Sequence, residues 1–343
     1  MCCCAHRRDT PGVNDKSQQS SRPTLAKVAL YARVSTATVS NVLAGKGGAS
    51  PATRDRVLRA AQQVGYRVDP GARALSKGRT TSVGVLVPSS VDELIRQRQS
   101  FFWVRLLDSF VTTASDLGVT TAIVDESQGQ AMVDSGIDVL VLLGHTDPYV
   151  ISQLSLPFGL PVVSPVDLPN LPSNAPQHDL NAIAETVVAE LARSNRQALA
   201  WMPGTASTQI DNWSNSLSEA ASRAGMSFVE LSHEDNAESL HSALSSEPGR
   251  RVDAIFGLFR NPRTLIEVLS QCDKKVPGDV AVIAQSEGIL EEVTTPSITT
   301  LSLCGFACGE ILATRAVEMA RGIESEIGTA PYEMTQREST ATN

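Results

Sequence analysis

Short, uncharged side chains line one face of the segment from Val34 to Leu43. Apolar residues recur in this segment at helical spacing, so it is predicted to form a helix with one buried face. The opposite face carries Thr36, Ala37, Ser40 and Asn41. A helix this slim fits a DNA major groove about 12 Å wide, where hydroxyl and amide groups can hydrogen-bond base edges. The chemistry indicated is recognition by hydrogen bonding, and the alternative is a plain capped surface helix.

Two further short helices are predicted to position this one. The first follows Thr24, a good N-cap, and repeats apolar residues at helical spacing over residues 25–32. Ser35 is placed to cap the second helix, so a tight turn joins the two in a helix-turn-helix unit. The third helix starts at the cap Ser50 and ends at Gly65. Three helices of this size make a minimal core, which is adequate when it is tethered to a larger body.

Formal charge is unevenly distributed along the 343 residues. Residues 22–80 carry eleven Lys and Arg against two Asp, a net charge of +9. Residues 81–343 carry fifteen basic and thirty-three acidic residues, a net charge of −18. A basic head on an acidic body predicts a polyanion-binding module joined to something else, with the acidic body limiting non-specific binding. The alternative is chance clustering on a solvated surface.

Residues 24–75 have the sequence TLAKVALYARVSTATVSNVLAGKGGASPATRDRVLRAAQQVGYRVDPGARAL. This segment resembles, without a gap, the N-terminal head of the lactose-repressor (LacI/GalR) family of bacterial transcription regulators. The resemblance implies base-reading positions at Thr36, Ala37 and Asn41. It implies phosphate-binding positions at Ser35, Thr38, Ser40, Ser50 and Thr53. It also implies a hinge that is helical only on DNA, with Ala72 and Leu75 entering the minor groove.

The residues support this hinge independently. The sequence DPGARAL has a cap, a Pro and a Gly, and it is too short to be stable as an isolated helix. An apolar wedge such as Leu75, supplied twice by a dimer, can unstack a base step and bend the duplex. The alternative is that Leu75 is only an apolar linker residue.

Two positions of the head depart from the family pattern. Arg33 stands in the turn where the family usually has Gly, and a left-handed Arg would cost roughly 1 kcal/mol, offset by a phosphate contact if one forms. Asn41 stands where the family often has Arg, and Asn prefers adenine over guanine. The preferred operator is therefore expected to differ from those of relatives with Arg.

Strands and helices are predicted to alternate from Thr81 onward. Strands are expected at 82–87, 119–124, 137–143, 160–163, 198–202, 254–258 and 279–284, and helices near 103–117, 179–193, 211–224, 262–272 and 305–322. Such alternation predicts an α/β fold with doubly wound parallel sheets, and this number of strands suits two lobes with a ligand cleft between them. The family resemblance implies the same: two lobes like a periplasmic sugar-binding protein, between which the chain crosses three times.

The predicted domain organisation has five parts. They are a disordered tail (1–22), a helix-turn-helix domain (23–68), a hinge (69–80), an effector-binding and dimerisation body (81–335) and a C-terminal tail (336–343). In the body, the N-lobe takes about 81–178 and 306–325, and the C-lobe about 179–305 and 326–335. Residues 91–100 are predicted to add an exposed loop, and the piece between Val124 and Ile137 looks too short for the usual helix.

The sugar-binding positions of the family are not matched in the body. An arginine that clamps sugar hydroxyls aligns with Trp213, an Asn-Asp pair with Phe259 and Arg260, and a later aspartate with Ser286. Because the usual carboxylates and bidentate donors are missing, an ordinary sugar effector is not predicted. Aromatic rings and a cation could instead bind a planar or anionic ligand. The alternative is that these residues pack the cleft and nothing is sensed there.

No pattern typical of an enzyme or a membrane protein is found in the sequence. Nucleophile-elbow, P-loop and zinc-protease motifs are absent, histidines are scattered and cysteines lack zinc spacing, so no catalytic residue, metal or cofactor is predicted. Apolar runs fall short of the roughly 20 residues that span a bilayer, and the N-terminus lacks the apolar core of a signal peptide. A cytoplasmic protein without a membrane partner is expected.

The function that fits these features is that of a dimeric repressor. One recognition helix reads only a few base pairs, so specificity requires a homodimer on a palindromic, double-stranded operator. A ligand in the cleft would modulate the affinity. One alternative is the same DNA binder without an effector, or controlled by a protein partner. Another is a cytoplasmic small-solute-binding protein, which the intact head disfavours.

Overall fold

The structure, a computed structural model, is described over ten stretches of the chain. They are residues 24–45, 48–66, 80–88, 101–143, 148–165, 173–203, 210–232, 234, 236–259 and 261–341. The predicted tail at 1–22, the loop at 91–100, and the hinge residues Ala72 and Leu75 lie outside the described residues, as does Arg260. Head and body form separate compact units, and each is treated by itself.

Three helices form the head, each begun by a hydroxyl cap. They are α1 (Leu25–Ala32), α2 (Thr36–Leu43) and α3 (Pro51–Gln63), and their caps are Thr24, Ser35 and Ser50. Each cap oxygen accepts a backbone N–H three residues later, which satisfies one of the amides that a helix start leaves free. Val28, Ala32, Val39, Val57 and Ala61 are fully buried where the helices meet. This is the small shared core expected of a helix-turn-helix module.

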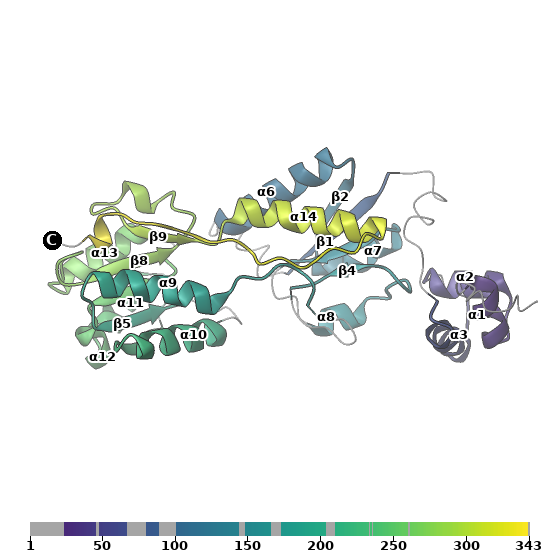
Figure 1. Ribbon diagram of the computed structural model, residues 1–343, viewed down its shortest axis with the longest axis horizontal. Helices are drawn as coiled ribbons and strands as arrows, with labels where there is room; N and C mark the ends of the chain where they lie inside the picture. The colour runs from purple at the N-terminus through teal and green to yellow at the C-terminus, as the bar shows by residue number, and fades with distance from the viewer. Residues whose placement is uncertain are drawn as a thin grey trace, which may run out of the picture. The chain divides into compact units, whose positions relative to one another are not determined.

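A four-stranded parallel sheet forms the N-lobe. Its order is β2 (Thr120–Asp125), β1 (Ser82–Val87), β3 (Val139–Leu142), β4 (Val162–Val163). One face packs on α6 (Phe101–Asp116) and α14 (Gly305–Arg321), which lie side by side (Figure 1). The other face packs on α7 (Gly129–Asp134) and α8 (Pro148–Gln153). A Cβ on Gly309 would lie 2.2 Å from the carbonyl oxygen of Leu106, so glycine permits the close approach of α14 to α6.

A six-stranded sheet forms the C-lobe. Its order is β10 (Glu333–Thr335), β9 (Thr299–Ser302), β8 (Ala281–Gln285), β7 (Ala254–Gly257), β5 (Ala198–Met202), β6 (Ser227–Glu230). All neighbours are parallel except β10 with β9. Helices α9 (Leu180–Arg193) and α10 (Ile210–Arg223) cover one face. Helices α11 (Ala237–Ser245) and α13 (Pro262–Gln271) cover the other, and α12 (Glu247–Arg251) follows α11.

Three connections join the two lobes, as expected. The first connection runs from β4 to α9, the second is Leu303 and Cys304 between β9 and α14, and the third is 322–332 between α14 and β10. Helix α14 therefore belongs to the N-lobe core although β9 and β10, on either side of it in sequence, pair in the C-lobe. No helix in the described part of the chain is long and apolar enough to cross a membrane.

Residues 336–341, which were assigned to a C-terminal tail, are attached to the C-lobe. After β10, the chain forms the short helix η3 (Glu338–Thr340), in which Ser339 and Thr340 are buried. The Ser339 hydroxyl donates to the carbonyl of Val282 (2.6 Å) and accepts from the amide of Thr299 (2.8 Å). This attachment was not predicted, because short polar residues suggest a solvated tail unless distant partners are known.

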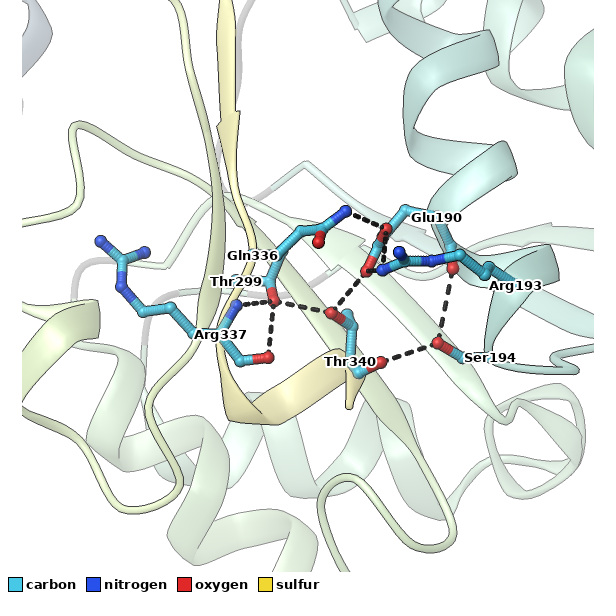
Figure 2. Close-up of polar contacts among 7 residues, drawn as sticks. All are labelled: Glu190, Arg193, Ser194, Thr299, Gln336, Arg337 and Thr340. Atoms are coloured by element: carbon cyan, nitrogen blue, oxygen red, sulfur yellow. Dashed lines mark hydrogen bonds and ion pairs between the residues drawn. The ribbon is translucent and has the colours of Figure 1, made fainter. Parts of the chain in front are cut away.

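A buried carboxylate completes this attachment (Figure 2). Glu190 of α9 accepts from the Gln336 amide and the Thr340 hydroxyl, each at 2.8 Å, and pairs with Arg193. The Ser194 hydroxyl donates to the Thr340 carbonyl at 2.8 Å. We call Glu190, Arg193, Ser194, Gln336 and Thr340 the C-terminal clasp. It fastens the last residues of the chain to the outer helix layer of the C-lobe.

Several predicted elements are confirmed and others were missed. The seven predicted strands are present within a few residues of their expected ends, as are the five helices. Strands β6, β9 and β10 and helices α8, α11 and α12 were not predicted. Between Val124 and Ile137, the chain still forms the short helix α7 and, before it, the single turn η1 (Glu126–Gln128). A reduced helix therefore fills the place that looked too short for one.

Candidate nucleic-acid interface and effector lobe

The outward face of α2 is the candidate base-reading surface. Thr36, Ala37, Ser40 and Asn41 are all exposed. Val39, Val42 and Leu43 on the opposite side are buried in the head core. The helix therefore presents hydroxyl, methyl and amide groups on a narrow ridge, without a long charged side chain to hold a base edge away. These residues are placed together as the sequence predicted.

Matching hydroxyl pairs stand at the N-termini of α2 and α3. Ser35 Oγ accepts the Thr38 amide at 3.0 Å and lies 2.9 Å from the Thr38 hydroxyl. Ser50 Oγ accepts the Thr53 amide at 3.3 Å and donates to the Thr53 hydroxyl at 3.0 Å. Helix N-termini carry free amides and a partial positive charge, which suits phosphate oxygens. Four of the five predicted phosphate-binding residues thus lie at two helix N-termini, and the fifth, Ser40, lies on the outward face of α2.

Arg33 adopts the left-handed backbone conformation anticipated for the turn. Its φ and ψ are 53° and 48°, and its side chain is exposed. The Val34 amide donates to the Ala29 carbonyl at 3.1 Å, a pattern that usually ends a helix with glycine at the position of Arg33. An arginine here carries a conformational cost that glycine would avoid.

Arg56 has a structural role that the sequence did not reveal. Its Nε donates to the carbonyl of Ala32, the last residue of α1, at 2.9 Å. The bond joins α3 to the end of α1 and satisfies a carbonyl that the helix leaves free. A basic residue in a basic head gives no local signal for such a contact, so Arg56 was counted only as positive charge.

The structure does not bring the predicted effector residues together. Trp213 is 5% exposed, and its ring stacks on Trp201 with centroids 5.7 Å apart. It belongs to the apolar cluster on the α9 and α10 face of the C-lobe sheet, whereas Phe259 packs with the cluster on the opposite face. Trp213 is therefore a core residue on one face of the sheet, whereas Phe259 packs on the other.

Ser286 follows β8 directly, and its hydroxyl accepts the amide of Gly288 at 3.2 Å. It closes a local turn. A cavity of about 330 Å³ lies along α14 and residues 325–328, and neither Trp213, Phe259 nor Ser286 lines it.

Comparisons with known proteins agree with this architecture. Residues 24–69 match the family described as bacterial regulatory proteins, lacI family, and residues 191–340 match the periplasmic binding protein-like domain. The regulator CelR of Thermobifida fusca is 24% identical over 338 residues, which cover 90% of this chain and 95% of CelR. The repressor CytR of Escherichia coli K12 is 30% identical over 152 residues, covering 44% and 42% of the two chains.

Solved structures establish the fold along most of the chain. The CelR–cellobiose complex has a TM-score of 0.62 at 22% identity and covers 93% of this chain and all of that one. The lac repressor dimer bound to operator and the anti-inducer ONPF has a TM-score of 0.64 at 18% identity and covers 93% and 99%.

The head and the body thus each match their own family, and the relatives that span the whole chain are regulators rather than enzymes. The chain belongs to the lacI family of DNA-binding transcriptional regulators, with a periplasmic-binding-protein-like effector-binding domain as its body.

Proposed function

We propose that this regulator is a repressor that binds a palindromic operator as a homodimer. The observation that carries the proposal is the exposed ridge of short side chains on α2, bordered by two hydroxyl-capped helix N-termini. Bases would be read by Thr36, Ala37 and Asn41. Phosphates would be held by Ser35, Thr38, Ser40, Ser50 and Thr53. Ala72 and Leu75, in the proposed hinge 69–80, would enter the minor groove, and the protein would act in the cytoplasm, where the operator DNA lies.

Exposed apolar side chains on the body support dimerisation. Phe101, Val104 and Val111 on α6 are each at least 36% exposed, and Leu290 and Val293 on the C-lobe are 39% and 70% exposed. Exposed apolar surface, where it is extensive, commonly marks a contact between subunits. The similar lac repressor structure is a dimer bound to operator, and a two-fold dimer is what a palindrome requires.

The effector, if one binds, is proposed not to be an ordinary sugar. CelR, which is similar over most of its length, has been solved with cellobiose. Here the position predicted to replace a sugar-clamping arginine is Trp213, which is buried in the C-lobe core. That burial favours the second candidate function, a DNA binder regulated by a protein partner or by its own abundance. A solute-binding role without DNA is disfavoured by the complete head.

Site selection from a random DNA library with the full-length protein, at near-physiological salt, tests the DNA-binding proposal. Recovery of a palindrome of roughly 14–20 base pairs is expected for a dimeric reader. A fixed, flexible central step would support the wedge role of Leu75. Enrichment of a single half-site without symmetry would contradict the dimer. If enrichment appears only when cell extract is added, binding requires a corepressor that the extract supplies.

Ligand-induced thermal stabilisation separates the two modes of control. A ligand at one hundred times its Kd stabilises the folded state by about 2.7 kcal/mol, which a melting curve detects readily. Cellobiose and other neutral sugars are expected to give no shift, whereas planar or anionic metabolites are the classes to screen. A clear shift with cellobiose would overturn the assignment against sugars.

A further inference from the structure

His178 lies on the first connection between the lobes and contacts the other two. Its Nε2 is 3.0 Å from the carbonyl oxygen of Leu303 on the second connection, and 3.0 Å from that of Pro331 on the third. Because a carbonyl oxygen can only accept, Nε2 must carry the proton and donate to both. One N–H group therefore joins the first connection to two segments that lie 125 and 153 residues further along the chain.

The backbone beside His178 strengthens the same junction. Gln177 forms an isolated parallel bridge with Thr329, and the Ala330 amide donates to the Gln177 carbonyl at 2.8 Å. These bonds tie the first connection to the third. The second connection is bonded by the His178 side chain. The imidazole therefore adds a bond to the one connection that these backbone bonds do not include.

Side chains of the N-lobe close around the imidazole. Cys308 on α14 donates its thiol to the Leu303 carbonyl (3.2 Å), and its sulfur lies 3.7 Å from His178 Nε2. The ring of Phe102 on α6 lies 6.5 Å from the imidazole, centroid to centroid. The two carbonyls that His178 binds adjoin the C-lobe strands β9 and β10. The imidazole therefore sits between groups of both lobes.

Cys304 gives the second connection the character of a hinge. It is a non-glycine residue in the left-handed region, with φ 52° and ψ 53°, immediately before α14. A lobe rotation must be absorbed by the backbone dihedrals of such connecting residues. Any change there would move the Leu303 carbonyl, one residue earlier, away from His178.

Burial, rather than the nearby charge, favours the neutral form of His178 in this contact. Burial lowers the pKa of His178, while the two carbonyl bonds and the carboxylate of Glu287 oppose that shift. Glu287 is itself engaged, because it accepts from the Ser302 hydroxyl at 3.0 Å and the Gly305 amide at 3.3 Å. The Cys308 thiol is protonated, because burial raises its pKa to about 12.

We propose that His178 is a positioning residue that holds the three connections between the lobes in one arrangement. A ligand or partner that reorients the lobes must then lengthen at least one of the two bonds to His178. The assignment does not depend on the effector proposed above, because it concerns the connections themselves and can be read without ligand or DNA.

Hydrogen–deuterium exchange on the full-length protein tests the assignment with two variants. His178→Phe keeps a ring but loses the donor, and His178→Gln keeps an N–H that can reach a carbonyl. Exchange in peptides covering 303–305 and 329–332 is expected to rise about tenfold in His178→Phe, which corresponds to one lost hydrogen bond. It should stay near the wild-type rate in His178→Gln. Core peptides around Val141 and Ile283 should be unchanged in both.

Two results would overturn the proposal. One is wild-type exchange at both connections in His178→Phe. The other is a uniform increase across the whole body, which would mean that His178 only supports general stability. If the Phe variant does not fold, His178→Ala provides the same comparison, and it should show the same confined increase at both connections.

Discussion

Trp201 and Trp213 stack at 5.7 Å between ring centroids, and Phe256 lies against both rings, on the α9 and α10 face of the C-lobe sheet. Trp213→Ala is expected to lower the free energy of unfolding by about 3–5 kcal/mol, because a large buried ring is replaced by a cavity. Trp213→Phe, which keeps a ring, should cost less than half as much. Urea denaturation followed by circular dichroism measures both. If Trp213→Ala lowers the free energy of unfolding by less than 1 kcal/mol, Trp213 is not a core residue and is again a candidate for the cleft.

Asn41 is expected to set one base of the operator. Asn forms a bidentate pair with adenine and Arg with guanine, so Asn41→Arg should switch the preferred base at one position of each half-site. The change in discrimination should be about 1–3 kcal/mol. Site selection with the variant measures it. Arg59→Gln, an exposed change on α3, is the matched control and should leave the selected sequence unaltered. An identical half-site from Asn41→Arg would exclude Asn41 as a base reader.

Arg33 is expected to lower the stability of the head and to raise its affinity for DNA. Arg33→Gly removes the left-handed penalty and should stabilise the head by about 1 kcal/mol, seen as slower hydrogen exchange of α2 amides. If Arg33 contacts one phosphate, the slope of log K against log salt should become shallower by about 0.9. Arg33→Lys keeps the charge and the penalty, so neither quantity should change much. Unchanged affinity and slope in Arg33→Gly would show that Arg33 does not reach the DNA.

The C-terminal clasp is expected to stabilise the C-lobe. In Glu190→Ala, the Gln336 amide and the Thr340 hydroxyl lose their shared acceptor, which should cost about 2–3 kcal/mol. Arg193 is 60% exposed and can turn to water, so Arg193→Ala should cost less than 1 kcal/mol. Urea midpoints compare the two variants. Equal small losses would mean that the clasp is dispensable.

The thiol of Cys308 is expected to be inert in the folded protein. Burial raises its pKa to about 12, so at pH 8 the reactive thiolate is roughly a thousandfold rarer than in an unfolded chain. Iodoacetamide labelling mapped by mass spectrometry should modify Cys308 only after urea is added. In the unfolded chain the Cys308 thiol ionises near pH 9, whereas in the folded protein it stays protonated to about pH 12. The free energy of unfolding should therefore fall as the pH rises above 9. Rapid labelling of the native protein would show that the α14 terminus opens.

Local signals account for the parts of this protein that the sequence predicted well. Ser35 and Ser50 cap their helices through bonds that span three residues, so composition and spacing suffice to find them. Strand β1 is likewise visible as a short β-branched run between turns. The left-handed conformation of Arg33 was raised as a possibility because the family that the head resembles usually has Gly at this position, and the structure shows it.

Long-range partners account for what the sequence did not predict. Thr299 and Thr300 are buried in β9, and the Thr299 amide and hydroxyl find partners only in residues 337–340, far along the chain. The helical spacing around Trp213 predicts α10 but not the stack with Trp201, which depends on the sheet. The sequence around His178, a loop histidine, did not predict its contacts, because its partners are backbone carbonyl groups that any residue supplies.

The position of β10 at the sheet edge has a consequence for biosynthesis. Domains generally fold from the N-terminus as the chain is made, and the head can do so because its buried core residues all lie between Val28 and Ala61. The C-lobe sheet is completed much later, since β10 and the buried Ser339 and Thr340 follow every other strand of that sheet in the chain. A nascent chain therefore carries a finished DNA-reading head while the edge of β9 is still uncovered. Truncation of the chain before Glu333 would remove β10 and leave the edge of β9 without its antiparallel neighbour.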